Sequence, residues 1–118
     1  MTGRCKRGEI YWVDWEPARG VEQRGRRPAL IVQNDVGNRS SPATVVAAIS
    51  SAAVKKAYPF LVLLAQGEAG LSKAGFVNCS QLVTIDQGRL LQLIGKLEAF
   101  KMSEVDKALA YELGLAPL

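Results

Sequence analysis

The chain has 118 residues, of which 48% are apolar and 22% charged, and its net charge is +4. This composition fits one globular domain spanning residues 1–118 and excludes a disordered chain, while no stretch approaches the ~20 apolar residues of a membrane span. The absence of histidine excludes histidine bases, histidine metal ligands and the usual serine-hydrolase triads, and we expect a cytoplasmic protein without metal or cofactor.

Residues 1–6 are polar, and we expect them to form a flexible arm. The next segment, E-I-Y-W-V-D-W at 9–15, alternates aromatic and branched residues and predicts a strand. We interpret Trp12 and Trp15 as core or interface residues rather than as stacking surfaces for RNA.

Residues 16–27 form a loop with four arginines, and residues 28–33 predict a second strand directly after it. Arginine is a planar, permanently charged donor, so a cationic loop joined to a rigid strand suits a phosphate ligand. The alternative is a solvated surface loop whose charges serve solubility.

Turn-forming residues predict a loop over 34–42, where Asn38 and Arg39 are candidates to read bases or bind phosphates, with ordinary turn chemistry as the alternative. A third strand is predicted over 43–50. It ends at Ser50 and Ser51, whose hydroxyls could donate to a phosphate; alternatively, these serines simply suit a turn.

The remaining segments alternate between short apolar runs and loops. A loop with Lys55 and Lys56 precedes a continuous apolar run that predicts a strand buried on both faces or lying in an interface. We predict strands at 60–65, 75–79 and 93–97, loops at 51–58 and 66–73, an irregular segment at 81–87 and a helical turn at 87–92.

One helix is predicted over residues 101–113. Ser103 is the expected N-cap, with Asp106 as its capping-box partner, and Gly114 is the expected stop signal. Val105, Leu109 and Leu113 would share its buried face. Without βαβ alternation, the sequence predicts a mainly β (α+β) fold, a small antiparallel barrel with a C-terminal helix.

The positive charge is concentrated in the first third of the chain. Residues 1–39 hold eight Lys or Arg against five Asp or Glu, which is the charge distribution expected of a nucleic-acid-binding protein. The two cysteines, Cys5 and Cys79, are too few for a zinc site. We expect two reduced thiols, with a disulfide between them as the alternative.

Several short motifs, in order, resemble the MazF/PemK family of toxins. They are K-R-G-E-I-Y at 6–11, G-V-E-Q-R-G-R-R-P at 20–28, V-Q-N-D-V-G-N at 32–38, A-A-I-S at 47–50, A-Y-P-F at 57–60, Q-L-V-T-I-D at 81–86 and V-D-K-A-L at 105–109. The resemblance implies an SH3-like barrel of the CcdB/PemK type that forms a homodimer. It also implies a sequence-specific, metal-independent endoribonuclease acting on single-stranded RNA, neutralised by a MazE-type antitoxin.

The resemblance also implies roles for individual residues. The essential arginine of the family falls on Arg27, its strand-end threonine on Ser50, and the glutamate of its G-x-E-Q turn on Glu22. At the position of Ser80 the family usually has an acidic residue. We expect this departure to affect which RNA sequence is cleaved more than the cleavage chemistry. We expect RNA contacts from Arg19, Gln23, Arg24, Arg26, Asn38, Arg39, Ser51, Lys55, Lys56, Ser80 and Gln81.

The implied reaction uses the RNA's own 2′-OH as the nucleophile and yields a 2′,3′-cyclic phosphate and a 5′-OH. Arg27 and Ser50 would stabilise the charge of the transition state. Arginine is a poor base because its pKa exceeds ~12, so Glu22 is favoured as base or as orienter of Arg27. Two alternatives remain from other classes, a non-enzymatic gyrase-inhibiting toxin of the same barrel fold and a plain nucleic-acid-binding module.

Overall fold

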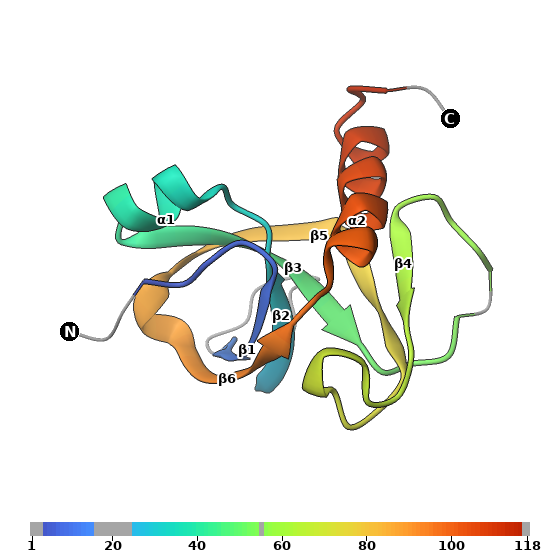
Figure 1. Ribbon diagram of the computed structural model, residues 1–118, viewed down its shortest axis with the longest axis horizontal. Coiled ribbons are helices and arrows are strands. Elements are labelled where there is room, and N and C mark those ends of the chain that lie inside the picture. Colours follow the sequence, from blue (N-terminus) through green and yellow to red (C-terminus); the bar gives the residue numbers. More distant parts are fainter. Residues whose placement is uncertain (1–3, 16–24, 55, 117–118) are drawn as a thin grey trace.

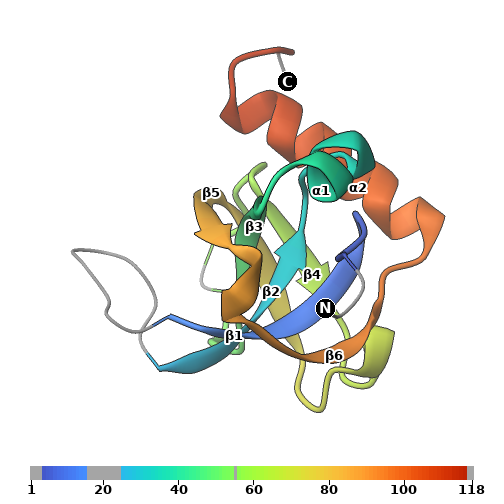
Figure 2. The ribbon, with the colours of Figure 1, turned by 90° about the vertical axis from the view of Figure 1, so that its left-hand side faces the viewer.

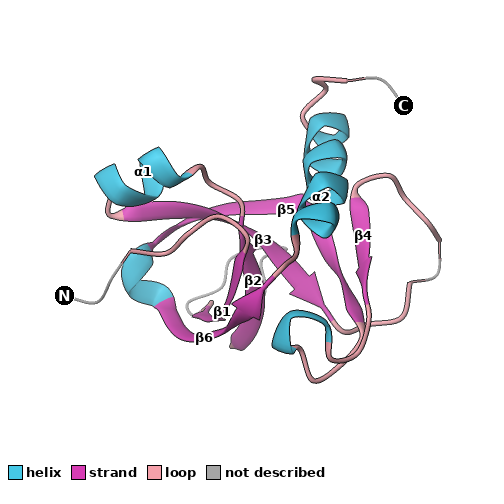
Figure 3. Cartoon of the chain, viewed as in Figure 1, coloured by secondary structure: helices cyan, strands magenta, loops and turns pink. Residues whose placement is uncertain are grey.

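The computed structural model describes residues 4–15, 25–54 and 56–116 (Figure 1). Strands are the most common regular element of the described chain, and the helices lie at its margins (Figure 3). The strands are β1 (Glu9–Asp14), β2 (Arg26–Ile31), β3 (Ala43–Ser50), β4 (Leu61–Leu64), β5 (Gly75–Asp86) and β6 (Leu90–Lys96). The α-helices are α1 (Asp35–Ser40) and α2 (Ala99–Glu112), and two 3-10 turns are η1 (Glu68–Gly70) and η2 (Gln87–Arg89).

The six strands form one antiparallel sheet in the order β4-β5-β3-β2-β1-β6. The sheet curls until η1, which follows β4, contacts β6 at the opposite edge. This approach requires glycine at position 95, because a Cβ there would collide with the carbonyl oxygen of Ala69. The predicted antiparallel barrel with a C-terminal helix is confirmed.

Alternate residues of the central strands enter two hydrophobic clusters, as the two-residue period of a strand requires. Leu30 and Ala47 belong to the larger cluster, which Val105 and Ala108 of α2 cover. Ala29 and Val46 belong to the second, which includes Cys5 and Trp15. The placement of Trp15 in the core is confirmed, and the central strands are buried on both faces.

The strand predictions succeeded in part. The third predicted strand has the observed bounds of β3. The segment at 81–87 was predicted to be irregular, but all of it except Gln87 belongs to the long strand β5. The prediction was wrong because Thr44 and Val46 of β3 pair with Ile85 and Val83, which places this segment in the sheet despite its mixed sequence. Of the two alternatives for the run at 60–65, burial of both faces within the chain is excluded, since Leu63 of β4 is 60% exposed. A place in an interface stays a prediction.

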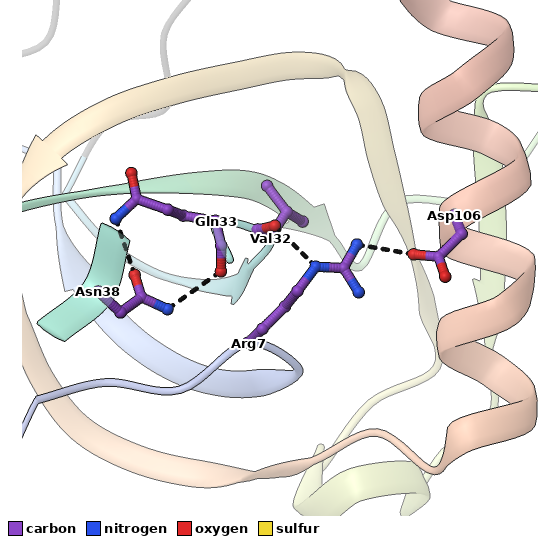
Figure 4. Close-up of polar contacts among 5 residues, drawn as sticks. All are labelled: Arg7, Val32, Gln33, Asn38 and Asp106. Atoms are coloured by element: carbon purple, nitrogen blue, oxygen red, sulfur yellow. Dashed lines mark hydrogen bonds and ion pairs between the residues drawn. The ribbon is translucent and has the colours of Figure 1, made fainter. Parts of the chain in front are cut away.

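The predicted loop at 34–42 instead contains α1. The Asn34 side chain caps this helix by accepting a hydrogen bond from the Gly37 N–H, at 2.8 Å. Asn38 is fully buried: its Nδ2 donates to the Gln33 carbonyl, and its Oδ1 accepts from Gln33 Nε2 (Figure 4). The same Oδ1 also accepts from Thr44 Oγ1. A turn-rich sequence therefore folds as a helix because a buried polar network stabilises it.

Helix α2 begins at Ala99, two residues earlier than predicted. Its N-cap is Glu98 rather than Ser103, which lies inside the helix. Val105 and Ala108 form the buried face, whereas Leu113 is 58% exposed, and Gly114 ends the helix in the left-handed region at φ +71. The guanidinium of Arg7 bonds both the Val32 carbonyl and Asp106 of α2, so it ties the helix to the sheet (Figure 4).

The described residues of the segment expected to be flexible make specific contacts. Arg4 donates to the Ser41 carbonyl, and the Cys5 N–H donates to the Gln87 side chain. Cys5 and Cys79 are free and buried in different clusters, and burial raises the pKa of the Cys79 thiol to about 11. Within the described ranges, no helix has the length and apolar character needed to cross a bilayer.

Asp35 makes stability depend on pH. The Arg7 N–H, at 2.7 Å, and then Asn38 Nδ2 donate to its carboxylate and hold its pKa below the usual 3.8. A lowered pKa means that folding favours the ionised form, so this stabilisation is present at neutral pH and is lost as the pH falls below about 4. Asp35→Asn should lower Tm by about 3–6 °C at pH 7 and by much less near pH 3.

Thermal unfolding of both proteins across this pH range measures the effect. Glu112→Gln, which removes an exposed carboxylate, serves as the control and should leave the pH dependence unchanged. A Tm difference for Asp35→Asn that is equally large at pH 3 and pH 7 would contradict the assignment.

Candidate functional site

The register of β2 against β3 brings the two principal site candidates together. Ala29 pairs with Ala48 and Ile31 with Val46, so the same register, extended by two residues, sets Arg27 beside Ser50. Both strands have a two-residue side-chain period, so the two side chains leave the sheet on the same face. In contrast to the predicted loop position, Arg27 lies within β2, where Pro28 favours an extended backbone for the residue before it.

Arg27 and Ser50 line one cavity of about 410 Å³. Its described lining contains three cationic side chains and three hydroxyls, but no carboxylate. The cations are Arg26, Arg27 and Lys73; the hydroxyls are Ser50, Ser51 and Ser72; the others are Trp12, Pro28, Ile49, Gly70, Leu71 and Ile94. Such a lining suits an anion with an apolar portion, because guanidinium, ammonium and hydroxyl groups all donate hydrogen bonds to phosphoryl oxygens.

This cavity lies at the end of the molecule away from the helices. Figures 1 and 2 show both helices on one side, while the start of β2, the end of β3 and η1 meet on the other. Leu71, Ser72 and Lys73, which follow η1, line the cavity. Gly75, at the start of β5, lies so close to β3 that an added Cβ would collide with the Ser50 carbonyl oxygen. The site therefore depends on the close approach of two backbones.

A hydrogen bond from the backbone two residues later orients the Ser50 hydroxyl. Its Oγ accepts a hydrogen bond from the Ala52 N–H at 3.1 Å, and no described residue accepts the Ser50 O–H proton. The oxygen is thus held in place while its proton can be donated to a ligand.

Several lining residues were missed by the sequence analysis, among them Ser72, Lys73 and Trp12. Lys73 lies in a segment read only as a loop, and Trp12 was assigned to the core or an interface. Trp12 is 38% exposed, whereas Trp15, three residues later, is buried. The alternation of β1 was the available signal, because it places these two residues on opposite faces of the strand.

Other predicted RNA-binding residues lie elsewhere. Asn38 was a wrong prediction, since its buried side chain is fully occupied by Gln33 and Thr44. Arg39 lies on α1, which precedes the first residue of β3, whereas Ser50 is the last residue of that strand.

The other residues predicted to contact RNA are exposed or half-buried, or they lie outside the described part of the chain. Ser80 is exposed and its hydroxyl donates to Asn78, Gln81 is half-buried beside it, and Lys56 lies over the Tyr58 ring. Arg19, Glu22, Gln23, Arg24 and Lys55 lie outside the described residues. Among the described residues, no three Cys, Asp or Glu side chains gather as a metal-binding group.

Comparison with known families decides how this chain is classified. Residues 6–113 match the model of the PemK-like, MazF-like toxins of type II toxin–antitoxin systems. The chain belongs to this family. It is also 40% identical over 110 residues to endoribonuclease EndoA of Bacillus subtilis strain 168, covering 93% of this chain and 95% of that protein.

Solved structures of MazF-like proteins share the fold. MazF from Deinococcus radiodurans is 29% identical and superposes with a TM-score of 0.79, covering 96% of this chain and 99% of its own. A mycobacterial endoribonuclease, solved in complex with its cognate antitoxin, has 24% identity, the same TM-score, and coverage of 97% and 99%. The MazF-like fold therefore holds across most of the chain.

Gly75 should be the least replaceable glycine at the site. Gly75→Ala would drive a methyl group into the Ser50 carbonyl, so β3 and β5 would have to separate, at a cost of about 3 kcal/mol in the free energy of unfolding. Urea denaturation measures this cost. The neighbouring exposed change Ala74→Ser should stay within about 0.5 kcal/mol of the wild type, and a similarly small effect of Gly75→Ala would contradict the close approach.

Proposed function

We propose that this protein cleaves single-stranded RNA at specific sequences, without a metal ion, by directing the RNA's 2′-OH onto the adjacent phosphorus. As a MazF-like toxin the chain is an endoribonuclease, as its relative EndoA is. The observation that carries the proposal is the cavity in which Arg27 and Ser50 meet two further cations and no described carboxylate.

In this reaction the 2′ oxygen forms a bond to phosphorus and the 5′ oxygen of the next nucleotide leaves. The products are a 2′,3′-cyclic phosphate and a free 5′-OH. One proton leaves the 2′-OH and one is delivered to the departing oxygen. Because RNA supplies the nucleophile, the protein has to orient the strand, move these protons and stabilise negative charge on the phosphoryl oxygens.

Arg27 is the proposed electrostatic stabiliser. It extends from a strand with buried neighbours, so its backbone is held by the core, and its planar fork can donate two parallel hydrogen bonds to a phosphate. Ser50 donates its free proton to the same phosphoryl group. Arg26 and Lys73 add positive charge that holds the flanking backbone.

Glu22 is the proposed base or the group that orients Arg27. The described cavity lining holds no carboxylate, so a carboxylate base must come from another segment. The residues on either side of the segment that carries Glu22 approach each other, since the Trp15 N–H donates to the Gly25 carbonyl at 2.9 Å. Gly25 directly precedes Arg26, which lines the cavity.

The proposed partners follow from family membership and charge. An acidic segment of a MazE-type antitoxin can neutralise the cavity by occupying the place of the RNA phosphates. We also propose a homodimer, which would cover exposed apolar side chains such as Leu63 and Phe100. The proposed site of action is the cytoplasm.

Arg27→Ala should abolish cleavage while RNA binding persists, because Arg26 and Lys73 remain. Ser50→Ala should slow cleavage by about 10²–10³, the usual effect of removing one donor to a developing oxyanion. Ser50→Thr keeps the hydroxyl and serves as the matched control, with near-normal turnover. Single-turnover cleavage of a labelled RNA and gel-shift binding measure both quantities; substantial turnover by Arg27→Ala would refute the assignment.

An RNA with deoxyribose at the cut nucleotide should bind with near-normal affinity and remain intact, because the nucleophile is missing. The all-ribose RNA should be cut equally fast with and without EDTA and give discrete fragments with 5′-OH ends. Cleavage of the deoxyribose substrate, or inhibition by EDTA that added Mg²⁺ reverses, would rule out this chemistry.

A further inference from the structure

A second cavity adjoins the proposed cleavage site. It has a volume of about 360 Å³ and is lined by Trp12, Arg26, Leu91 and Gln92. We call it the Trp12 pocket. Trp12 and Arg26 also line the cavity that holds Arg27 and Ser50, so the two cavities share a wall. Both volumes fall in the range of ligand pockets, about 300–1,000 Å³.

A β-bulge builds the Trp12 pocket. In the pairing of β1 with β6, Tyr11 pairs with Leu93 and Val13 with Leu90. One residue of β1, Trp12, therefore faces two residues of β6, Leu91 and Gln92. A bulge of this kind turns side chains away from their regular positions, which agrees with the exposure of both Trp12 and Leu91.

The chemistry of the pocket matches a nucleobase. The indole of Trp12 offers a flat stacking surface, and Leu91 adds apolar contact. The Gln92 amide can both donate to and accept from a base edge, and the Arg26 guanidinium can stack on a base or bind its phosphate. These four side chains combine the two features by which proteins bind unpaired bases, a stacking surface and an adaptable polar group.

We propose that the Trp12 pocket holds the base of a nucleotide flanking the scissile phosphate, with Trp12 stacking on the base and Gln92 contacting its edge. The inference rests on the proposed RNA cleavage. The shared wall favours RNA over a side chain of the antitoxin, because a nucleotide whose phosphate lies between Arg27 and Ser50 carries a base within reach of Trp12. The pocket thereby contributes to the choice of cleavage sequence.

A cut site is first mapped with the wild-type protein. The test then measures binding of an RNA that carries deoxyribose at this site and so cannot be cut. Two further versions of this RNA lack the base at one or the other flanking nucleotide. One abasic substitution should weaken wild-type binding roughly 5- to 150-fold, the usual effect of losing one stacked base. Trp12→Ala should cause a loss of similar size with the intact RNA and no further loss with that abasic RNA. Trp12→Phe, which keeps an aromatic face, should bind nearly as the wild type does, and an abasic site far from the cut should have no effect.

Two further measurements separate stacking from a structural role. RNA should quench the fluorescence of Trp12 in the wild type but not in Trp12→Phe, where buried Trp15 supplies the remaining signal. Gln92→Ala should cut at the mapped sites and also at sites that differ only at the flanking base. Steady-state rates should show the Trp12→Ala effect in KM and the Arg27→Ala effect in kcat.

Specific results would overturn the inference. If Trp12→Ala lost affinity equally for intact and abasic RNA, the effect would be purely structural and the inference would be overturned. If Trp12→Ala does not fold, wild-type binding that is unaffected by an abasic site at both flanking positions still overturns the inference. Weakened antitoxin binding with unchanged RNA binding would assign the pocket to the antitoxin instead. Absence of any wild-type cleavage would contradict the proposed function itself, whereas normal cleavage independent of Trp12 would contradict only the pocket.

Discussion

The pairing of β2 with β3 is the contact on which the site depends. Ala29, Leu30 and Ile31 are buried on both faces of the sheet, opposite equally buried residues of β3. A slip of one residue would exchange the residues of the two hydrophobic clusters, so the burial of apolar surface fixes the register. Arg27 and Ser50 are only two residues beyond this paired segment, and their positions follow from it.

The contacts that stabilise the fold and the candidate site lie on different sides of the molecule. The buried polar network around Asn38, with α1 and the Arg7 contacts to Val32 and α2, lies on the side of the helices. The cationic cavity lies on the other side, where strands end and backbone groups approach closely. Placing cations at the ends of buried strands preorganises them, so little reorganisation is needed when negative charge develops on a bound phosphate.

The same sheet provides two recognition elements of different character. Regular pairing places the cations and hydroxyls that suit a phosphate, whereas the irregular pairing of β1 with β6 exposes Trp12 beside Leu91 and Gln92. The bulge sets Trp12 opposite two residues of β6 instead of one, which groups the three side chains around one pocket. The cavity suited to a phosphate and the pocket suited to a base thus lie on neighbouring parts of one surface.

The sequence by itself determined the strand-rich fold, the bounds of β3 and the family, because strand alternation and local motifs are short-range signals. It also named Arg27 and Ser50 as site candidates, and the structure brings the two into one cavity. It did not reveal α1, the length of β5, the burial of Asn38, or the places of Trp12 and Lys73 in the cavity. Each of these depends on residues distant in the chain: Thr44 completes the Asn38 network, β3 draws Ile85 into the sheet, and a bulge in β6 exposes Trp12. Only the tertiary structure decided them, because packing between distant segments outweighs local preference wherever the two compete.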